Sequence, residues 1–509
     1  MRTKPSRKIQ SEVLWGQILP DSLRKHHTLQ DALRMSLVEA ILSGKLPAGE
    51  RLPSTRELAQ LLKIARITVA LTYERLATQG FLESRERRGY FVAPRGEHSA
   101  TRLKLRAEQT AAPDWEQRVV TGIVQDKWLE KPRDWQSYPF PFVYGQLDPK
   151  LFPLAEWREC SRLAQAVPDS SRWAADAIDL DDPMLVSEIL TRVLPKRGIV
   201  AQADEVIVTL GTQMALFLLS ELLLGTSSTV GIEDPGYMDA RNIFLRRGAK
   251  LQRLPVGENG IELSDRLHEC DYVYCTPSHQ CPTGATLPLE SRLELLRLAE
   301  QHDFVLIEDD YDAETQFVGQ PSPALKAMDR SGRVIYVGSF SKILSPGLRI
   351  GYIVAPAQLI QKARLLRRLI IRHPPTNNQR AMALFIAQGH YEVLLASNRA
   401  SLEQRARRIT DACRKHLPRW QFREPMGGSA LWLRAPEHMN MLKVTQQARS
   451  HGILLESGTV FFAEEPPGNY LRLAYSTIPL ESIEPGIERL SRIVRGMRQR
   501  RDTAQVRSR

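Results

Sequence analysis

One loop constrains this chain more than any other feature: residues 334–352, which read VIYVGSFSKILSPGLRIGY. A run of β-branched and aromatic residues ends in a small polar loop that presents Lys342. Ser339, Ser341 and Arg349 lie close to this lysine in the sequence. A lysine amine can form a Schiff base with an aldehyde, and hydroxyls with a guanidinium group can hold a phosphate. The loop therefore suits a cofactor that carries both an aldehyde and a phosphate.

The spelling S-F-S-K-x-L-x-P-G-L-R-x-G-Y resembles the pyridoxal-phosphate lysine motif of the fold-type I aminotransferases. The resemblance implies that the cofactor is pyridoxal 5'-phosphate (PLP) and that Lys342 forms the Schiff base with it. It also implies that Ser339, Ser341 and Arg349 belong to the cofactor site. The alternative is an ordinary loop lysine, which would leave this long match unexplained.

Length and composition limit the class of protein. A chain of 509 residues with 42% hydrophobic content predicts more than one domain with large cores. No apolar run is long enough to span a bilayer, and the basic start of the chain lacks the apolar stretch of a signal peptide. Five cysteines form neither a metal-ligand pattern nor a disulfide framework. We therefore expect a cytoplasmic protein with reduced thiols and no metal.

The positive charge is concentrated at the N-terminus. Residues 1–110 hold 20 Lys and Arg against 11 Asp and Glu, so this fifth of the chain carries most of the net charge of +12. A basic module joined to a nearly neutral remainder points to a polyanionic partner for that module.

The N-terminal module shows a pattern of three helices and a hairpin. Two capping boxes, Thr28 with Asp31 and Ser54 with Glu57, predict the starts of the first two helices. A third helix is expected over residues 66–79, and a basic tip before Gly89 separates two short strands. These strands are expected at residues 81–83 and 90–92. Together the elements predict a winged helix-turn-helix, which binds double-stranded DNA.

The third helix separates an apolar face from a polar one. Val69, Tyr73 and Leu76 form the inward stripe, and the helix has the size to enter the major groove. We expect hydroxyls and a guanidinium group to face the base edges. The side chains expected on this polar face are Thr68, Thr72, Arg75 and Gln79.

The sequence ERLPSTRELA…RITVALTYERLATQGFL resembles the GntR-family DNA-binding domain over almost all of residues 28–93. The resemblance implies that Arg56 and Arg66 contact phosphates or bases and that Thr68 docks the recognition helix. Gly89 would let the wing approach the minor groove. A polar residue is usual where Ile67 stands, so a base contact there is missing or replaced. The alternative is a small helical domain that docks a protein.

The rest of the chain reads as a linker followed by an α/β domain. Short apolar runs alternate with amphipathic segments such as residues 214–224, which predicts a mainly parallel sheet with its site at the carboxyl ends of the strands. The expected domains are a winged helix-turn-helix over residues 1–94, a linker over 95–139 and an aminotransferase-like domain over 140–509. The linker lacks clean periodicity, with one possible amphipathic helix near 115–128. The expected strands are 206–208, 229–233, 272–275, 304–308 and 334–337.

A helix begins just after the first of these strands. Gly211 admits a close approach, Thr212 adds a hydroxyl and Gln213 follows, so backbone N–H groups at this helix start can seat a phosphate. An ordinary helix cap would look the same.

Further residues acquire roles from the aminotransferase resemblance. It implies that Tyr237 stacks on the cofactor ring, that Asp309 keeps the pyridine nitrogen protonated and that Tyr311 bonds the ring hydroxyl. Arg472, in the segment YLRLAYS, is implied to bind a ligand carboxylate. Cys281 stands where the family commonly has an asparagine. The alternatives are a core tyrosine, an acidic loop that caps a helix and a surface arginine.

A GntR-type DNA-binding domain joined to an aminotransferase-like domain resembles the MocR subfamily of bacterial transcription regulators. The resemblance implies a domain-swapped homodimer on operator DNA and a small amino compound as ligand. That compound would displace Lys342 by forming an external aldimine and so change the orientation of the domains. Two alternatives stay open: an active PLP-dependent aminotransferase that also binds DNA, and a regulator that senses PLP itself.

Overall fold

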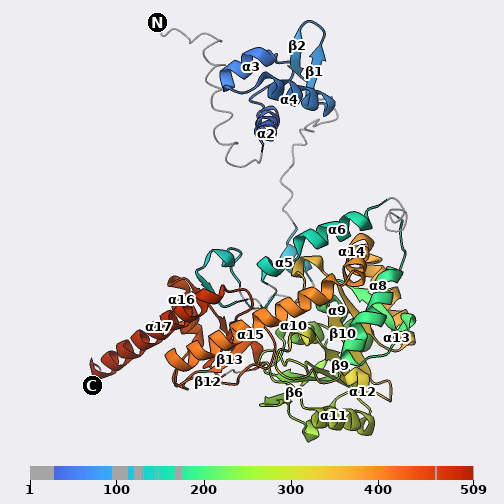
Figure 1. The fold of residues 1–509 in the computed structure, drawn as a ribbon, viewed down its shortest axis with the longest axis vertical. Coiled ribbons are helices and arrows are strands. Elements are labelled where there is room, and N and C mark those ends of the chain that lie inside the picture. Colours follow the sequence, from blue (N-terminus) through green and yellow to red (C-terminus); the bar gives the residue numbers. More distant parts are fainter. Residues whose placement is uncertain are drawn as a thin grey trace. The chain divides into compact units, whose positions relative to one another are not determined.

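The chain divides into two compact units, Met1–Gly122 and Ile123–Arg509, and each is described by itself (Figure 1). In the part of the chain that is described, no helix combines the length and the apolar character that a membrane span requires. The computed structural model describes residues 28–94, 113–119, 129, 131–143, 145–146, 148–166, 175–464 and 467–507.

The first unit contains the expected three helices and hairpin. The Thr28 hydroxyl accepts a hydrogen bond from the Asp31 amide, and Ser54 forms a complete capping box with Glu57. Both predicted helix starts are therefore confirmed. The winged helix-turn-helix consists of α2 (Leu29–Leu42), α3 (Thr55–Leu62), α4 (Arg66–Thr78), β1 (Leu82–Arg85) and β2 (Gly89–Val92).

The core of this unit forms where the three helices meet. Val69, Tyr73 and Leu76 are fully buried, as their spacing predicts, and the Tyr73 hydroxyl donates to the Pro53 carbonyl at 3.1 Å. The placement of Thr72 on the polar face is wrong. Thr72 is fully buried, and its hydroxyl donates to the Thr68 carbonyl at 2.7 Å, which satisfies the polar group inside the core.

An eight-stranded sheet forms the centre of the second unit, in the order β4-β11-β10-β9-β8-β5-β6-β7. The sheet is mainly parallel, as expected, but β11 runs antiparallel to both of its neighbours and β7 runs antiparallel to β6. The strands are β4 (Val206–Thr209), β5 (Thr229–Asp234), β6 (Lys250–Gly257), β7 (Gly260–Ile261), β8 (Tyr272–Cys275), β9 (Val305–Asp309), β10 (Val334–Ser339) and β11 (Gly351–Val354).

Helices cover both faces of this sheet. Ile207 and Ile335 pack with α9, α10 and α13 on one face, whereas Val208 and Tyr336 pack with α8, α14 and α15 on the other. Adjacent strand residues point to opposite faces, so strands covered on both sides are apolar throughout. These helices are α8 (Pro183–Glu188), α9 (Thr212–Leu223), α10 (Met238–Arg246), α13 (Ala357–Ile371), α14 (Thr376–Ala387) and α15 (His390–His416).

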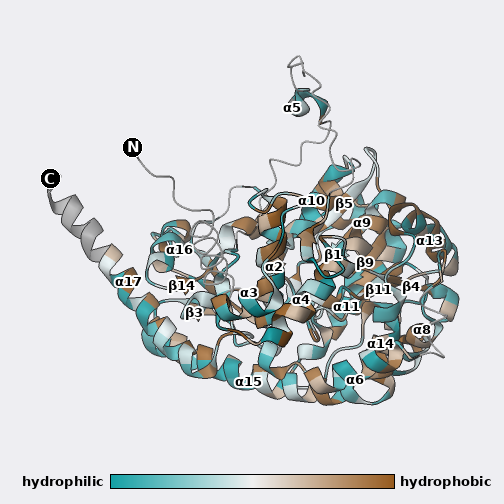
Figure 2. Ribbon diagram, turned by 90° about the horizontal axis from the view of Figure 1, so that it is seen from above, coloured by the Kyte–Doolittle hydropathy of each residue, from teal (hydrophilic) through white to brown (hydrophobic). Residues whose placement is uncertain are grey.

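A smaller sheet, β12-β13-β16-β15, follows in the sequence and packs against α15, α16 and α17. Teal and brown segments alternate along α15 and α17 (Figure 2), which fits helices with one buried and one exposed face. The bounds are β12 (Gln421–Phe422), β13 (Ala430–Arg434), β15 (Glu456–Ser457), β16 (Tyr470–Ala474), α16 (Met441–Ser450) and α17 (Leu480–Arg507).

The remaining elements include part of the expected linker. Only Trp115–Arg118 (α5) of the predicted helix is seen, and residues 120–128 lie outside the described residues. Residues 131–139 fall within the second unit. Also present are β3 (Phe140–Pro141), which pairs with β14 (Ile453–Leu454), α6 (Leu154–Ala164), α11 (Leu289–His302) and α12 (Leu325–Met328).

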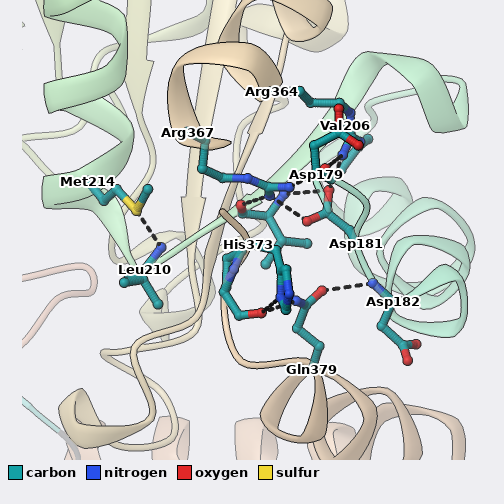
Figure 3. A network of polar contacts seen from close by, with 12 residues as sticks. Asp179, Asp181, Asp182, Val206, Leu210, Met214, Arg364, Arg367, His373 and Gln379 are labelled. Atoms are coloured by element: carbon teal, nitrogen blue, oxygen red, sulfur yellow. Dashed lines mark hydrogen bonds and ion pairs between the residues drawn. The ribbon is translucent and has the colours of Figure 1, made fainter. Parts of the chain in front are cut away.

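A buried polar network holds the end of β4 in place (Figure 3). Arg367, which is fully buried, pairs with Asp181 and donates to the Val208 carbonyl at 2.6 Å. Arg364 pairs with Asp181 at 2.7 Å and donates to the Val206 carbonyl at 2.7 Å. One carboxylate therefore balances two guanidinium groups, and the network connects α13 to the strand that leads into α9.

Replacing Asp181 with asparagine should destabilise the second unit strongly. The substitution leaves buried guanidinium charge without its carboxylate, which costs about 3 kcal/mol when one partner of a buried pair is lost. Urea unfolding followed by far-UV circular dichroism measures the change. Asp411→Asn is the control, since the Asp411 carboxylate is 72% exposed and pairs only on the surface with Arg414. Equal stability of the two variants would contradict this role for the network.

Candidate functional site

The carboxyl ends of β4, β9 and β10 meet at one cavity of about 590 Å³. Of the eleven residues expected at the cofactor and ligand, only Gly211 does not line it, and Gly211 is adjacent to Thr212, which does. The expected residues at its wall are Thr212, Gln213, Tyr237, Asp309, Tyr311, Ser339, Ser341, Lys342, Arg349 and Arg472.

Lys342 follows β10 and points into the cavity. Its Nζ donates to the carbonyl of Gly145 and lies 5.6 Å from the centre of the Tyr311 ring. Burial lowers the pKa of Lys342 and outweighs the attraction of Asp312, with nearby Arg472 lowering it further. A lowered pKa favours the neutral amine, which is the form that attacks an aldehyde.

Asp309 ends β9 inside the same cavity. Its Oδ2 accepts a hydrogen bond from the Tyr274 hydroxyl at 2.8 Å, while its buried Oδ1 has no hydrogen-bond partner among the described residues. Burial raises the pKa of Asp309 to about 7. A buried acceptor without a partner is costly, so this oxygen is suited to a donor brought by a ligand, such as a protonated ring nitrogen.

The two acidic neighbours of Asp309 are engaged elsewhere. Glu308 accepts from the backbone amides of Leu325 and Lys326 at 2.8 and 2.9 Å. Asp310 pairs with Arg197 at 2.8 Å, and neither Glu308 nor Asp310 lines the cavity. Among these three carboxylates, Asp309 is therefore the one available to a cofactor.

The start of α9 and the lysine loop also form part of the cavity wall. Gly211 has a φ of +81°, and a Cβ there would lie 3.2 Å from Nη2 of Arg349. That Nη2 donates to the Leu210 carbonyl at 2.7 Å. Ser341 Oγ is buried without a hydrogen-bond partner among the described residues, and the Ser339 hydroxyl accepts from the Ser341 amide. Hydroxyls, a guanidinium group and a helix N-terminus together fit a phosphate.

The residues present therefore fit PLP. An amine, an unpaired buried carboxylate oxygen and a phosphate seat lie around one cavity, which matches the aldehyde, the ring nitrogen and the phosphate of that cofactor.

Tyr237 and Gln213 share a partner that the sequence analysis missed. The Tyr237 hydroxyl and the Gln213 amide donate to the same oxygen of Asp239, at 3.0 and 2.8 Å. Asp239 also lines the cavity, and its position two residues after Tyr237 is the only sequence signal that could have indicated it.

Arg472, which lines the cavity, is paired with a carboxylate. β15 pairs with β16 so that Glu456 stands directly opposite Arg472, and Nη1 of Arg472 donates to Oε2 of Glu456. The other oxygen of Glu456 lies 3.6 Å from Nζ of Lys131. The sequence analysis missed both Glu456 and Lys131, since no local motif marks either residue.

The first unit presents its basic residues to solvent. Arg56, Arg66, Arg75 and Gly89 are exposed, and Thr68 is partly buried at the start of α4. Ile67 is 64% exposed, so an apolar side chain stands on the outer surface of the recognition helix. An exposed apolar side chain can contact the methyl group of thymine in the major groove.

Comparisons with known proteins cover both units. Residues 160–490 match the family "Aminotransferase class I and II", and residues 29–92 match "Bacterial regulatory proteins, gntR family". The probable rhizopine catabolism regulatory protein MocR of Rhizobium meliloti is 33% identical over 473 residues, which cover 91% of this chain and 92% of that protein. The chain belongs to the MocR subfamily of GntR-type transcription regulators.

Other relatives agree with this MocR assignment. The HTH-type transcriptional regulator TauR of Rhodobacter capsulatus is 40% identical over 470 residues, covering 92% of this chain and 97% of that protein. Among solved structures, the α-aminoadipate aminotransferase LysN of Thermus thermophilus, in complex with N-(5'-phosphopyridoxyl)-L-leucine, has a TM-score of 0.69 and 28% identity. The match covers 75% of this chain and 99% of the LysN chain. This MocR-type regulator therefore combines a DNA-binding domain with an aminotransferase-like domain.

Proposed function

We propose that this regulator binds PLP at Lys342 and senses an amino compound in the same cavity, with the result expressed as a change in operator binding. The observation that carries the proposal is the convergence on one cavity of the Lys342 amine, the unpaired Asp309 oxygen and the unpaired Ser341 hydroxyl. Within the part of the chain that the structure describes, Oδ1 of Asp309 and Oγ of Ser341 have no hydrogen-bond partner, and Nζ of Lys342 donates to the Gly145 carbonyl.

Each residue has a distinct task in this proposal. When bound, PLP supplies an aldehyde that reacts reversibly with amines and a ring that withdraws electrons. Asp309, held by the Tyr274 hydroxyl, would accept a hydrogen bond from the protonated ring nitrogen. Tyr237 would stack on the ring and Tyr311 would bond its hydroxyl, while Gly211 to Gln213, Ser339, Ser341 and Arg349 would hold the phosphate.

Arg472 gives the cavity a preference for amino compounds that also carry an acidic group. Its guanidinium is buried at the wall, and Nε has no hydrogen-bond partner among the described residues. A guanidinium group can bind a carboxylate in a bidentate manner, so an amino acid can engage the amine-reactive centre and Arg472 together.

The regulatory output requires two states of the protein. The MocR assignment supports a domain-swapped homodimer in which the DNA-binding domain of one subunit packs on the large domain of the other. An amino compound alters DNA binding only if it binds the two domain orientations with different free energies. Arg56, Arg66, Thr68, Arg75 and Gly89 are the proposed DNA contacts.

Arg472→Ala should raise the ligand requirement without altering the absorption of the bound cofactor. Loss of a charge-assisted hydrogen bond predicts a roughly tenfold or larger increase in the amino-acid concentration that gives half of the spectral change. Spectral titration of the PLP-loaded protein with an amino-acid panel measures this increase. Arg434→Ala is the matched control, because Arg434 lies on the neighbouring strand with a half-exposed side chain. Unchanged titrations in Arg472→Ala would remove Arg472 from the ligand site.

The same samples test the proposal as a whole. Sensing predicts that one or more amino compounds change both the visible spectrum and the affinity for operator DNA. A spectrum that responds while operator affinity stays constant, with keto acid released in many turnovers, would instead indicate an active aminotransferase. An effect of PLP on DNA binding with no further effect of any amino compound would indicate a sensor of PLP itself.

A further inference from the structure

Two carboxylates are found among the described residues that line the cavity, and the proposed function uses only one of them. Asp309 is assigned to the cofactor ring, whereas Asp239 has no task there. Asp239 lies in the first turn of α10, two residues after Tyr237. A polar group that lines a ligand cavity and is not engaged by the cofactor is placed to orient the ligand.

One oxygen of Asp239 is fixed by two protein donors. Its Oδ2 accepts a hydrogen bond from the Tyr237 hydroxyl at 3.0 Å and another from the Gln213 side-chain amide at 2.8 Å. Burial, reinforced by the charge of Asp239, holds the pKa of Tyr237 well above its ordinary value, so this hydroxyl stays protonated and donates. Gln213 belongs to α9 and Asp239 to α10, so contacts from two elements set the orientation of the carboxylate.

The other oxygen of Asp239 is available to a ligand. In the described part of the chain Oδ1 accepts no hydrogen bond, and it is not among the atoms that burial shuts off from solvent. Asp239 also forms no ion pair with any described cation: within the same cavity wall, Arg349 donates to the Leu210 carbonyl and Arg472 to Glu456. The start of α10 has no side-chain cap, so Oδ1 is not used to cap the helix.

The charge of Asp239 determines what Oδ1 can bind. An accessible carboxylate oxygen attracts a cation and repels a second acid. Because Asp239 is partly buried, charges near it are screened less than charges in bulk water. Its place in the first turn of α10 also favours the ionised form, since the N-terminus of a helix carries partial positive charge. The carboxylate therefore discriminates between ligands by charge.

We propose that Asp239 is a specificity-determining residue of the ligand site, and that its Oδ1 accepts a second cationic group at the far end of the amino compound. This inference deepens the proposed function and rests on it for the reaction of the first amine at Lys342. It identifies the ligand class as diamino compounds, which include basic amino acids such as ornithine. Neutral amino compounds lack the group that Asp239 binds, and a second acid is repelled.

Matched pairs of compounds test this preference on the PLP-loaded protein. The pairs are L-ornithine with L-norleucine, putrescine with pentylamine, and cadaverine with hexylamine, so that the members of a pair differ only in an ammonium group against a methyl group. Saturation-transfer NMR measures binding, and the visible spectrum measures reaction with the cofactor. In at least one pair the diamino member should bind about tenfold more tightly, the scale of a charge-assisted hydrogen bond. Equal binding within every pair would overturn the inference.

Variants connect the preference to the charge of Asp239. In Asp239→Asn the preference within that pair should fall to about threefold or less, because the side chain keeps a carbonyl oxygen for Tyr237 and Gln213 but loses its charge. Asp239→Glu keeps the charge and should retain a preference for the diamino member of at least one pair. Asp411→Asn is the control, since Asp411 is exposed on α15. A purely structural role would weaken both members of a pair equally in Asp239→Asn, and the preserved ratio would contradict the inference.

The outcomes separate the two proposals. If amino compounds change the spectrum and the operator affinity with no preference for diamino members, the role of Asp239 is refuted and amine sensing stands. If diamino compounds bind preferentially, lose that preference in Asp239→Asn and leave the spectrum unchanged, amine sensing is refuted and the role of Asp239 stands.

Discussion

Lys342→Ala should leave the protein without a visible absorption band after incubation with PLP, and borohydride should trap no cofactor on the chain. The reason is that the Lys342 amine, which follows β10, lines the same cavity as Asp309, Ser341 and Arg349. An alanine there removes the nucleophile while keeping the surrounding cavity. We expect complete loss of covalent attachment, which is the largest effect of any single substitution in this account.

The measurement is absorbance spectroscopy followed by peptide mapping after reduction. Lys443→Ala is the control and should bind cofactor normally, since Lys443 is exposed on α16. Lys131 is the informative competitor, because it also lines the cavity. Attachment that persists in Lys342→Ala and maps to Lys131 would show that the reactive lysine has been assigned incorrectly.

Arg56→Ala and Arg66→Ala should each weaken operator binding roughly tenfold and flatten its dependence on salt. Arg56 is exposed on α3 and Arg66 is exposed at the start of α4, on the helices that are expected to contact DNA. Each lost phosphate contact should reduce the slope of log K against log salt by about 0.9, because fewer counterions are released on binding. A lost base contact would instead weaken binding at every salt concentration and leave the slope unchanged.

Fluorescence anisotropy over a salt series distinguishes these cases, with DNA selected by the protein from random sequences. Lys45→Ala is the control for net charge, since Lys45 is exposed in the turn after α2 and is not one of the expected contact residues. If Lys45→Ala weakens binding as much as the two arginine substitutions do, the effect is one of overall charge. The proposed contacts would then be refuted.

Local sequence predicted which residues would meet at the cavity. Parallel strands place their carboxyl ends together, so residues that follow separate strands, such as Asp309 and Lys342, were expected to meet. The sequence could not distinguish Asp309 from its neighbours Glu308 and Asp310. In the structure only Asp309 of these three lines the cavity. Strand alternation and the contacts of Arg197 and α12 direct those two carboxylates elsewhere.

Other features depend on contacts between distant segments. The approach of Lys131 to Glu456 joins positions more than 300 residues apart, and no motif marks either side. Thr72 was placed on the polar face because its hydroxyl was counted as polar. Inside the helix that hydroxyl is satisfied by the Thr68 carbonyl, so the residue packs as an apolar one. The antiparallel strand β11 was also not expected, although it directly follows the lysine loop.

The central claim is that the reaction of an amino compound in the cavity changes the affinity of the protein for operator DNA. The most direct test is the operator affinity of the PLP-loaded protein, measured by anisotropy with and without each amino compound that changes its visible spectrum. We predict a change of about fivefold or more in the unsubstituted protein, the usual scale of allosteric coupling, and none in Lys342→Ala. Identical operator affinity with and without every such compound would contradict the claim.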